Sequence, residues 1–277
     1  MSSPSYDYYI TAVRDLVQAS DIQNAILKLT RPTLTAISRI TSGDSGDQEV
    51  EDTLYNLWSA FIAEAESTSD ESVHAKLIKG LEAIKSLPPA IIPKKGNESE
   101  QEQYSNWGGF VWNDLPILGA NMREKWNYQD NGDEEARAQW VNLNAFVARI
   151  AVAHIAGFEL YAIWSLRDAF EGTEFAERGA PLNGLVPAAA QWILIAGRLM
   201  YHSQRVWIVP TNQGDPARGG SLIPVIKKGF SKERWAFWRK GFEIVSQYLG
   251  EQIGKGTRAV AMEAWDKMNE IERSGSA

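Results

Sequence analysis

The sequence predicts an all-α protein. Apolar residues recur at intervals of three and four, strand-like alternation is nearly absent, and proline and glycine clusters divide the chain into segments of helix length. We expect a compact multi-helix domain in which an N-terminal helical layer, residues 1–103, packs on a tryptophan-rich helical core, residues 104–277. All but one of the eleven tryptophans lie at or beyond residue 107.

The first hundred residues indicate a run of short amphipathic helices. An apolar face that includes Val13 and Leu16 marks the first one. Further helices are expected at about 47–66, after a turn-rich segment, and at about 70–87, where a proline pair stops the helix. Residues 88–103 are polar and bounded by prolines, which is typical of a surface linker or loop.

The rest of the chain predicts further helices. A strongly apolar stretch after Pro187 has the composition of a central, buried helix. Ser231 and Thr257 are the expected N-caps of the last two helices. The segments 134–156 and 158–170 are either one helix bent at Gly157 or two separate helices. The expected helices cover about 115–127, 134–156, 158–170, 188–203, 231–249 and 257–271.

The composition excludes several classes of site. The chain has no cysteine and three histidines, so we expect no disulfide, no thiol nucleophile, no metal centre and no cofactor. Its start lacks the order of a signal peptide, and no apolar stretch reaches membrane-spanning length. We therefore expect a cytoplasmic protein with no membrane partner.

Polar side chains interrupt the apolar faces of three expected core helices. A buried charge costs several kcal/mol unless it is paired, so such residues either form ion pairs that cross-link the helices or line a polar pocket. Both interpretations stay open, with Arg149 or Arg198 paired to Glu159 or Asp168 in the first. The polar residues on these faces are Asn142, Arg149, Glu159, Tyr161, Ser165, Asp168, Gln191, Arg198 and His202.

The segment WGGFVWNDLPILGANMREKWN, residues 107–127, is a weaker candidate. Its Gly108-Gly109 pair permits close backbone approach to an oxyanion, and Asp114 follows it. Packing of this aromatic loop over the end of the helical bundle is the favoured interpretation. The sequence contains no phosphate-loop, GxSxG or HExxH pattern.

The charge is unevenly placed along the chain. Residues 198–240 carry nine basic and two acidic residues, a net +7, so the rest carries -14 to give the total of -7. Aromatic residues interleave with these cations, which suits single-stranded or end-on RNA recognition, although a solvated helix face explains the pattern too. The candidate RNA-binding residues are Lys227, Lys228, Lys232, Arg234, Arg239 and Lys240.

Five segments together resemble a fungal family long catalogued only as a domain of unknown function. They are WGGFVWNDLPILGANMREKWN, WVNLNAFVARI, FELYAIWSLRDAFE, VPAAAQWILIAGRLMY and SKERWAFWRKGFE, and the resemblance covers about residues 104–250. This type of protein is similar to fungal arginine-containing cyclodipeptide synthases. The resemblance implies aminoacyl-tRNA substrates, one of them arginyl-tRNA, and a cyclic dipeptide product, with no requirement for ATP.

The polar residues within this region are our candidates for that chemistry. A carboxylate is needed for the arginyl guanidinium, and amide or hydroxyl donors are needed for the oxyanion. The candidate catalytic residues are Glu159, Asp168, Asn142, Tyr201 and Ser165. The candidate substrate-binding residues are Asp114, Arg149, Gln191, Arg198 and Trp164.

Two other classes of function remain open from the sequence. One is a non-catalytic helical module that binds a protein or small ligand through its tryptophan-rich surface. The other is a tRNA-independent tailoring enzyme of secondary metabolism with a helical pocket. Salt-sensitive tRNA binding separates the cyclodipeptide synthase from the binding module. Turnover in the absence of tRNA would indicate the tailoring enzyme.

Overall fold

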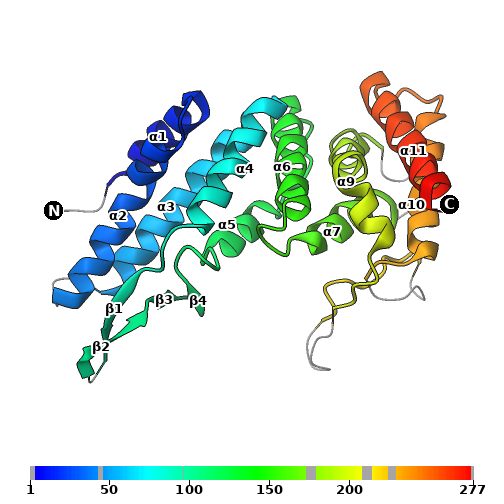
Figure 1. Cartoon of the computed structure of the whole chain (residues 1–277). Coiled ribbons are helices and arrows are strands. Elements are labelled where there is room, and N and C mark those ends of the chain that lie inside the picture. The colour runs from blue at the N-terminus through cyan, green and yellow to red at the C-terminus, as the bar shows by residue number, and fades with distance from the viewer. Residues whose placement is uncertain are drawn as a thin grey trace. The chain divides into compact units, whose positions relative to one another are not determined.

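The protein is mostly helical in a computed structural model, as the periodicity predicts (Figure 1). The structure describes residues 4–42, 46–95, 97–172, 179–207, 214–223 and 229–275. By its internal contacts the chain divides into two compact units, residues 1–128 and 129–277. The division follows Tyr128 rather than Gln103, so the WGGFVWNDLPILGANMREKWN segment belongs to the N-terminal unit.

Five helices make up most of the N-terminal unit: α1 (Tyr6–Gln18), α2 (Gln23–Ser42), α3 (Asp47–Glu66), α4 (Glu71–Lys85) and α5 (Leu118–Lys125). Helices α1 to α4 pack on one another around apolar side chains such as Leu16, Trp58 and Phe61, all fully buried (Figure 1). The Trp58 indole Nε1 donates to the carbonyl of Pro116 at 2.8 Å, which fixes the segment before α5 against α3.

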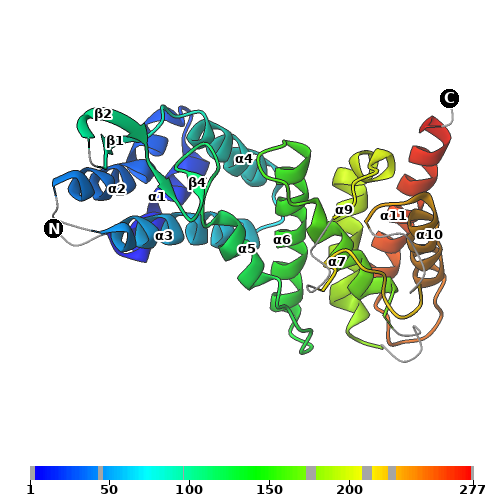
Figure 2. The ribbon, with the colours of Figure 1, turned by 90° about the horizontal axis from the view of Figure 1, so that it is seen from below.

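Residues 88–103 are not the predicted linker, because most of them form a β-hairpin. Strand β1 (Ile91–Lys94) pairs antiparallel with β2 (Asn97–Gln103), and Figure 2 shows this hairpin beside α2. A second, shorter hairpin joins β3 (Ser105–Asn106) to β4 (Gly109–Phe110). The polar sequence of β2 gives no alternation of apolar side chains, and main-chain hydrogen bonds define both hairpins.

Five further helices are described in the C-terminal unit: α6 (Glu134–Val152), α7 (Glu159–Phe170), α9 (Leu182–His202), α10 (Lys232–Ser246) and α11 (Lys255–Gly275). Helix α9 contacts α6, α7, α10 and α11, so it is the central helix, as its apolar sequence predicts. A turn at 153–158 separates α6 from α7, and the two are therefore distinct helices rather than one bent at Gly157.

The caps of the last two helices differ. Ser231 caps α10 as predicted, since its Oγ accepts from the Arg234 N–H at 3.1 Å. The prediction for Thr257 is wrong, because α11 begins two residues earlier at Lys255. The Thr257 hydroxyl instead donates to Asn183 Oδ1 at 2.9 Å and so ties α11 to the start of α9.

Candidate functional site

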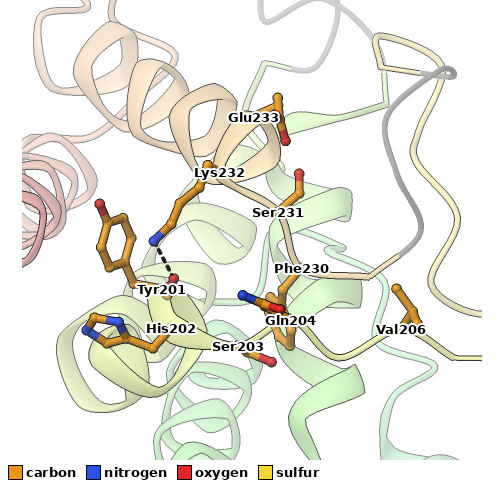
Figure 3. A pocket seen from close by; sticks show the side chains of 9 residues that line it. All are labelled: Tyr201, His202, Ser203, Gln204, Val206, Phe230, Ser231, Lys232 and Glu233. Carbon is orange, nitrogen blue, oxygen red and sulfur yellow. Dashed lines mark hydrogen bonds between the residues drawn. The ribbon is translucent and has the colours of Figure 1, made fainter. Parts of the chain in front are cut away.

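An open pocket of about 570 Å³ lies in the C-terminal unit, between the last turn of α9 and the first turn of α10. We call it the α9–α10 pocket. Its walls combine hydroxyl, amide, imidazole, ammonium and carboxylate groups with two apolar side chains. The lining residues, drawn in Figure 3, are Tyr201, His202, Ser203, Gln204, Val206, Phe230, Ser231, Lys232 and Glu233.

Lys232 links the two helices at this pocket. Its Nζ donates to the backbone carbonyl of Tyr201 at 2.7 Å and lies 2.9 Å from the centroid of the Tyr201 ring (Figure 3). The same ring contacts Trp235 edge-on, with ring centroids 5.1 Å apart. An ammonium at the C-terminal carbonyls of α9 is stabilised by the helix dipole, so a positive charge is held at the pocket wall.

Phe230 and Ser231 precede Lys232 in the chain and also line the pocket. The Phe230 N–H donates to the carbonyl of Arg205 at 3.3 Å, which places the two extended segments side by side. The Phe230 ring lies 5.9 Å from that of Trp207 and 6.4 Å from that of Trp238. The wall therefore rests on a cluster of aromatic rings.

A buried ion pair fixes the segments that lead into this wall. Arg234 and Glu171 are both 0% exposed, and Nε and Nη2 of the arginine donate to Oε1 and Oε2 of the glutamate at 2.7 and 2.9 Å. The three remaining guanidinium N–H groups donate to the carbonyls of Ala217, Arg218 and Gly229. Every N–H of the guanidinium is thus used, as a buried charge requires.

The glutamate of this pair is satisfied to the same degree. Glu171 Oε1 also accepts from the Trp238 indole at 2.7 Å, and Oε2 accepts from the Gly220 N–H at 2.9 Å. The pair therefore gathers α7, α10 and two loop segments around one centre. Sequence reasoning missed Glu171 because its partner lies 63 residues away, and no local spacing signals such a pairing.

Arg234 was predicted to bind RNA, and its burial corrects that prediction. Arg239 and Lys240 lie nearer the surface and have acidic neighbours: Arg239 Nε is 3.1 Å from Glu272, and Lys240 Nζ is 2.6 Å from Glu243. Of the four candidate RNA-binding residues that the structure describes, Lys232 is the one that lines the pocket. Lys227 and Lys228 lie outside the described residues.

Each of the two candidate catalytic carboxylates has an arginine neighbour. Glu159 Oε2 lies 2.6 Å from Arg205 Nη1, and Asp168 Oδ1 lies 3.8 Å from Arg167 Nε. Asp168 is exposed, so it does not belong to a core stripe, while the Glu159 side chain is largely shielded at the start of α7.

The candidate hydroxyl and amide residues separate into a pocket group and a core group. Tyr201 lines the pocket. Ser165 is 3% exposed, and its Oγ donates to Asn144 Oδ1 at 2.6 Å. That placement makes Ser165 a core residue and corrects its prediction as a nucleophile. Asn142 is half-buried, two residues before Asn144, which is the amide that the fold buries completely.

Asn144 was not among the candidates, and it is the centre of a buried polar network. Its Oδ1 accepts from the Trp192 indole at 2.8 Å as well as from Ser165, and its Nδ2 donates to the Trp140 carbonyl at 2.9 Å. A signal for it exists in the sequence. Asn144 lies on the same face of the helix as Trp140 and Ala148, at intervals of four residues. The sequence prediction instead placed the face of Asn142 toward the core.

The remaining candidate substrate-binding residues are dispersed. Asp114 belongs to the N-terminal unit, where its Oδ2 accepts from the Phe110 N–H at 2.8 Å. Arg198 was predicted to point inward, but its side chain is 63% exposed and lies 3.5 Å from Glu270. Trp164 donates its indole N–H to the Pro216 carbonyl at 2.7 Å. Arg149 donates to the Ala145 carbonyl of its own helix at 3.1 Å, and Gln191 is half-buried on α9; neither lines the pocket.

Comparison with known proteins gives a family. The model of a family described as protein of unknown function (DUF3632) matches residues 58–242, about two thirds of the chain. The chain belongs to this family. The DUF3632 match begins in α3 and ends in α10, so it takes in parts of both compact units and all of the pocket residues. No curated protein and no solved structure matches.

The described residues contain neither a metal-binding cluster nor a membrane-spanning helix. Within those residues no group of three or more His, Asp or Glu side chains is arranged to hold a metal ion. Over the same part of the chain, no helix combines the length and the apolar character needed to cross a membrane.

Proposed function

We propose that this DUF3632 protein is an aminoacyl-tRNA-dependent cyclodipeptide synthase, which joins arginine and a second amino acid into a diketopiperazine, with the α9–α10 pocket as its reaction site. The observation that carries the proposal is the lining of this pocket. A space of about 570 Å³ is of the size that small-molecule sites have, and its lining supplies an ammonium, a carboxylate, an imidazole and hydroxyls. The resemblance of the motifs supplies the class of reaction.

The reaction needs groups of the kinds that line the pocket. The α-amine of one aminoacyl group attacks the ester carbonyl of the other, so a C–N bond forms, the ester C–O bond breaks, and the 3′-hydroxyl of the tRNA leaves with a proton. His202 or Glu233 accepts the proton of the attacking amine. Lys232 and the Tyr201 hydroxyl stabilise the oxyanion. A second attack of the same type closes the ring.

The arginyl guanidinium calls for a carboxylate. Glu233 is the pocket residue with that chemistry. Glu159 is the second candidate; it does not line the pocket, and its carboxylate pairs with Arg205 at 2.6 Å, so an arginyl group would have to displace that side chain. Replacing Glu159 and Asp168 separately by Ala tests the roles that we assigned to them from the sequence.

The proposal is tested by expression in a bacterial host, whose own charged tRNAs supply the substrates, followed by mass spectrometry for arginine-containing cyclic dipeptides. We expect Lys232→Met and Glu233→Gln to lower the product at least tenfold. Lys255→Met and Glu263→Gln are matched controls, since both residues are exposed on α11 outside the pocket, and they should leave the yield unchanged. Well-expressed, folded wild-type protein that makes no such product would overturn the proposal.

The ion pairs of the basic stretch favour a second candidate, a helical module that binds a ligand without tRNA. Arg198, Arg234 and Arg239 each have an acidic partner, which leaves fewer cations for phosphates. Charge reversal at Lys227 and Lys228 discriminates the two candidates. If it lowers tRNA affinity in a salt-dependent manner, the tRNA substrate is supported; unchanged affinity favours the module, and turnover without tRNA favours the tailoring enzyme.

A further inference from the structure

The shorter hairpin of the N-terminal unit turns on a tryptophan. Trp107 and Gly108 connect β3 to β4, with Asn106 paired to Gly109. Both connecting residues have positive φ, 52° and 75°. A two-residue turn of this kind favours Asn-Gly, and a bulky side chain in the left-handed region is strained. The residue at the first turn position is therefore not the one that folding prefers.

The Trp107 ring contributes little packing to the fold. It is 66% exposed, and Phe110 beside it is 44% exposed. Trp112 differs from Trp107 in burial: its φ of 73° is also positive, but its side chain is only 1% exposed. Burial of a tryptophan stabilises the fold by more than such strain costs, so Trp112 has a structural reason for its conformation. Trp107 lacks one.

The turn is nevertheless held in place. Asp114 Oδ2 accepts from the Phe110 N–H at 2.8 Å, and the Val111 N–H donates to the Tyr104 carbonyl at 3.3 Å. The Tyr104 hydroxyl in turn donates to Asp47 Oδ1 at 2.7 Å, which anchors the hairpin to the start of α3. The tryptophan is thus presented on a fixed support rather than on a loose loop.

The surroundings of the turn are acidic. Residues 96–122 contain no Lys or Arg and four carboxylates, Glu98, Glu100, Glu102 and Asp114. One of them, Glu100, pairs with Lys94 of β1 at 2.8 Å. Within the described residues, Glu102 and Asp114 are exposed, and Asp114 lies directly against the turn, with its Cβ 3.1 Å from where a Gly109 Cβ would be. This charge disfavours a nucleic acid on the surface and complements a cation.

We propose that the Trp107 turn, formed by Trp107, Gly108, Phe110 and Asp114, is a docking surface for a cationic segment of a partner protein, with the exposed Glu102 five residues before the tryptophan in the sequence. A lysine or arginine side chain lies over the face of Trp107, where a cation is attracted to the ring, and its neighbours meet the carboxylates. This surface is separate from the α9–α10 pocket, and the inference does not depend on the reaction proposed there.

The test uses the full chain and a fluorescein-labelled nona-arginine peptide, with binding followed by fluorescence anisotropy. We expect Trp107→Asn to weaken the peptide at least tenfold and Glu102→Gln to weaken it two- to threefold, because the first removes the ring and the second one screened charge. Leu27→Asn and Glu82→Gln are the matched controls, an exposed apolar and an exposed acidic residue of the same unit, and should stay within twofold of wild type.

A stability measurement separates docking from folding. Since Asn suits the turn better than Trp does, Trp107→Asn should leave the urea midpoint unchanged or raise it. Equal peptide binding by wild type and Trp107→Asn would overturn the proposal. So would a lowered urea midpoint, which would make Trp107 a folding residue, or Trp107-dependent binding of labelled oligouridylate without binding of the peptide.

Discussion

The C-terminal unit buries a charged pair, whereas the buried polar side chains described in the N-terminal unit are hydroxyls, amides and an imidazole. Thr30 and His74 each bond to a nearby backbone carbonyl, four and nine residues away. Glu171 and Arg234 draw their partners from segments up to 67 residues apart. Sequence distance alone does not separate the units, because Asn121 of the N-terminal unit donates to the Tyr55 carbonyl and the Ser59 hydroxyl, 66 and 62 residues away. The number of partners does separate them: a buried charge needs many, so the fold of the C-terminal unit depends more strongly on single polar residues.

The largest expected effect is at the ion pair. Arg234→Met leaves the Glu171 carboxylate buried without its cation, so the free energy of unfolding should fall by about 3–5 kcal/mol. Urea denaturation followed by tryptophan fluorescence measures it. Lys240→Met on the same helix removes an exposed pair and should change the free energy by less than about 1 kcal/mol. Similar losses in both variants would contradict the larger stability contribution that we assign to the buried pair.

The next effect is at the buried amide. Asn144→Ala removes the acceptor of the Ser165 hydroxyl and the Trp192 indole, so two buried donors lose their partner and the free energy of unfolding falls by about 2–4 kcal/mol. Asn142→Ala, two residues earlier and half-buried, should cost less than about 1 kcal/mol. A reversed order in urea denaturation would mean that the network does not stabilise this unit.

Gly220 tests how closely the loop fits around Glu171. A Cβ at this glycine would lie 2.1 Å from the Glu171 carbonyl oxygen, so Gly220→Ala must displace the backbone, at about 1–3 kcal/mol. In α11 a Cβ at Gly256 would have no neighbour within 4 Å, and Gly256→Ala should be neutral or stabilising. Thermal unfolding of the two variants checks this difference, and a Gly220→Ala protein as stable as wild type would contradict it.

The smallest effect is expected in the N-terminal unit, at Tyr104. Its hydroxyl donates to Asp47, so Tyr104→Phe should cost about 1 kcal/mol at pH 7. Burial, followed by this hydrogen bond, raises the pKa of Tyr104 above its ordinary value of about 10. The contribution of the neutral hydroxyl is therefore complete below pH 10 and is lost as pH rises through the higher folded pKa.

The pH dependence gives the check on Tyr104. Above pH 10 the unfolding free energy of wild type should fall faster than that of Tyr104→Phe, and the gap between the two proteins should narrow. Urea midpoints of both proteins between pH 7 and pH 11.5 measure the gap. A constant gap over this range would show that Tyr104 does not titrate with folding.

Helix positions follow from the sequence where local chemistry decides them. The apolar face of α3 and the proline pair after α4 set the expected ranges well, and Ser231 caps α10 as its residue type predicts. The hairpin at 91–103 escaped prediction because β2 is polar throughout and β1 is a four-residue strand that contains a proline, so no apolar alternation marks either strand. Thr257 shows that a residue type suited to capping does not decide where a helix starts.

The candidate site was less predictable than the fold. The sequence predicted Tyr201 as a catalytic residue and Lys232 as an RNA-binding residue, and the fold brings the two together at the pocket. Arg234 belonged to the same basic stretch and is fully buried. Spacing along a helix shows which residues share a face, but it does not show which element that face meets.

The sequence by itself determined the helical class, the ends of several helices and the uneven charge, because these depend on propensity, periodicity and composition. The tertiary structure alone decided which polar residues pair: Glu171 with Arg234, Asn144 with Ser165, Glu159 with Arg205. The physical reason is that the energy of a polar group depends on partners within about 3 Å, and partners so distant in the sequence become neighbours only when the chain folds.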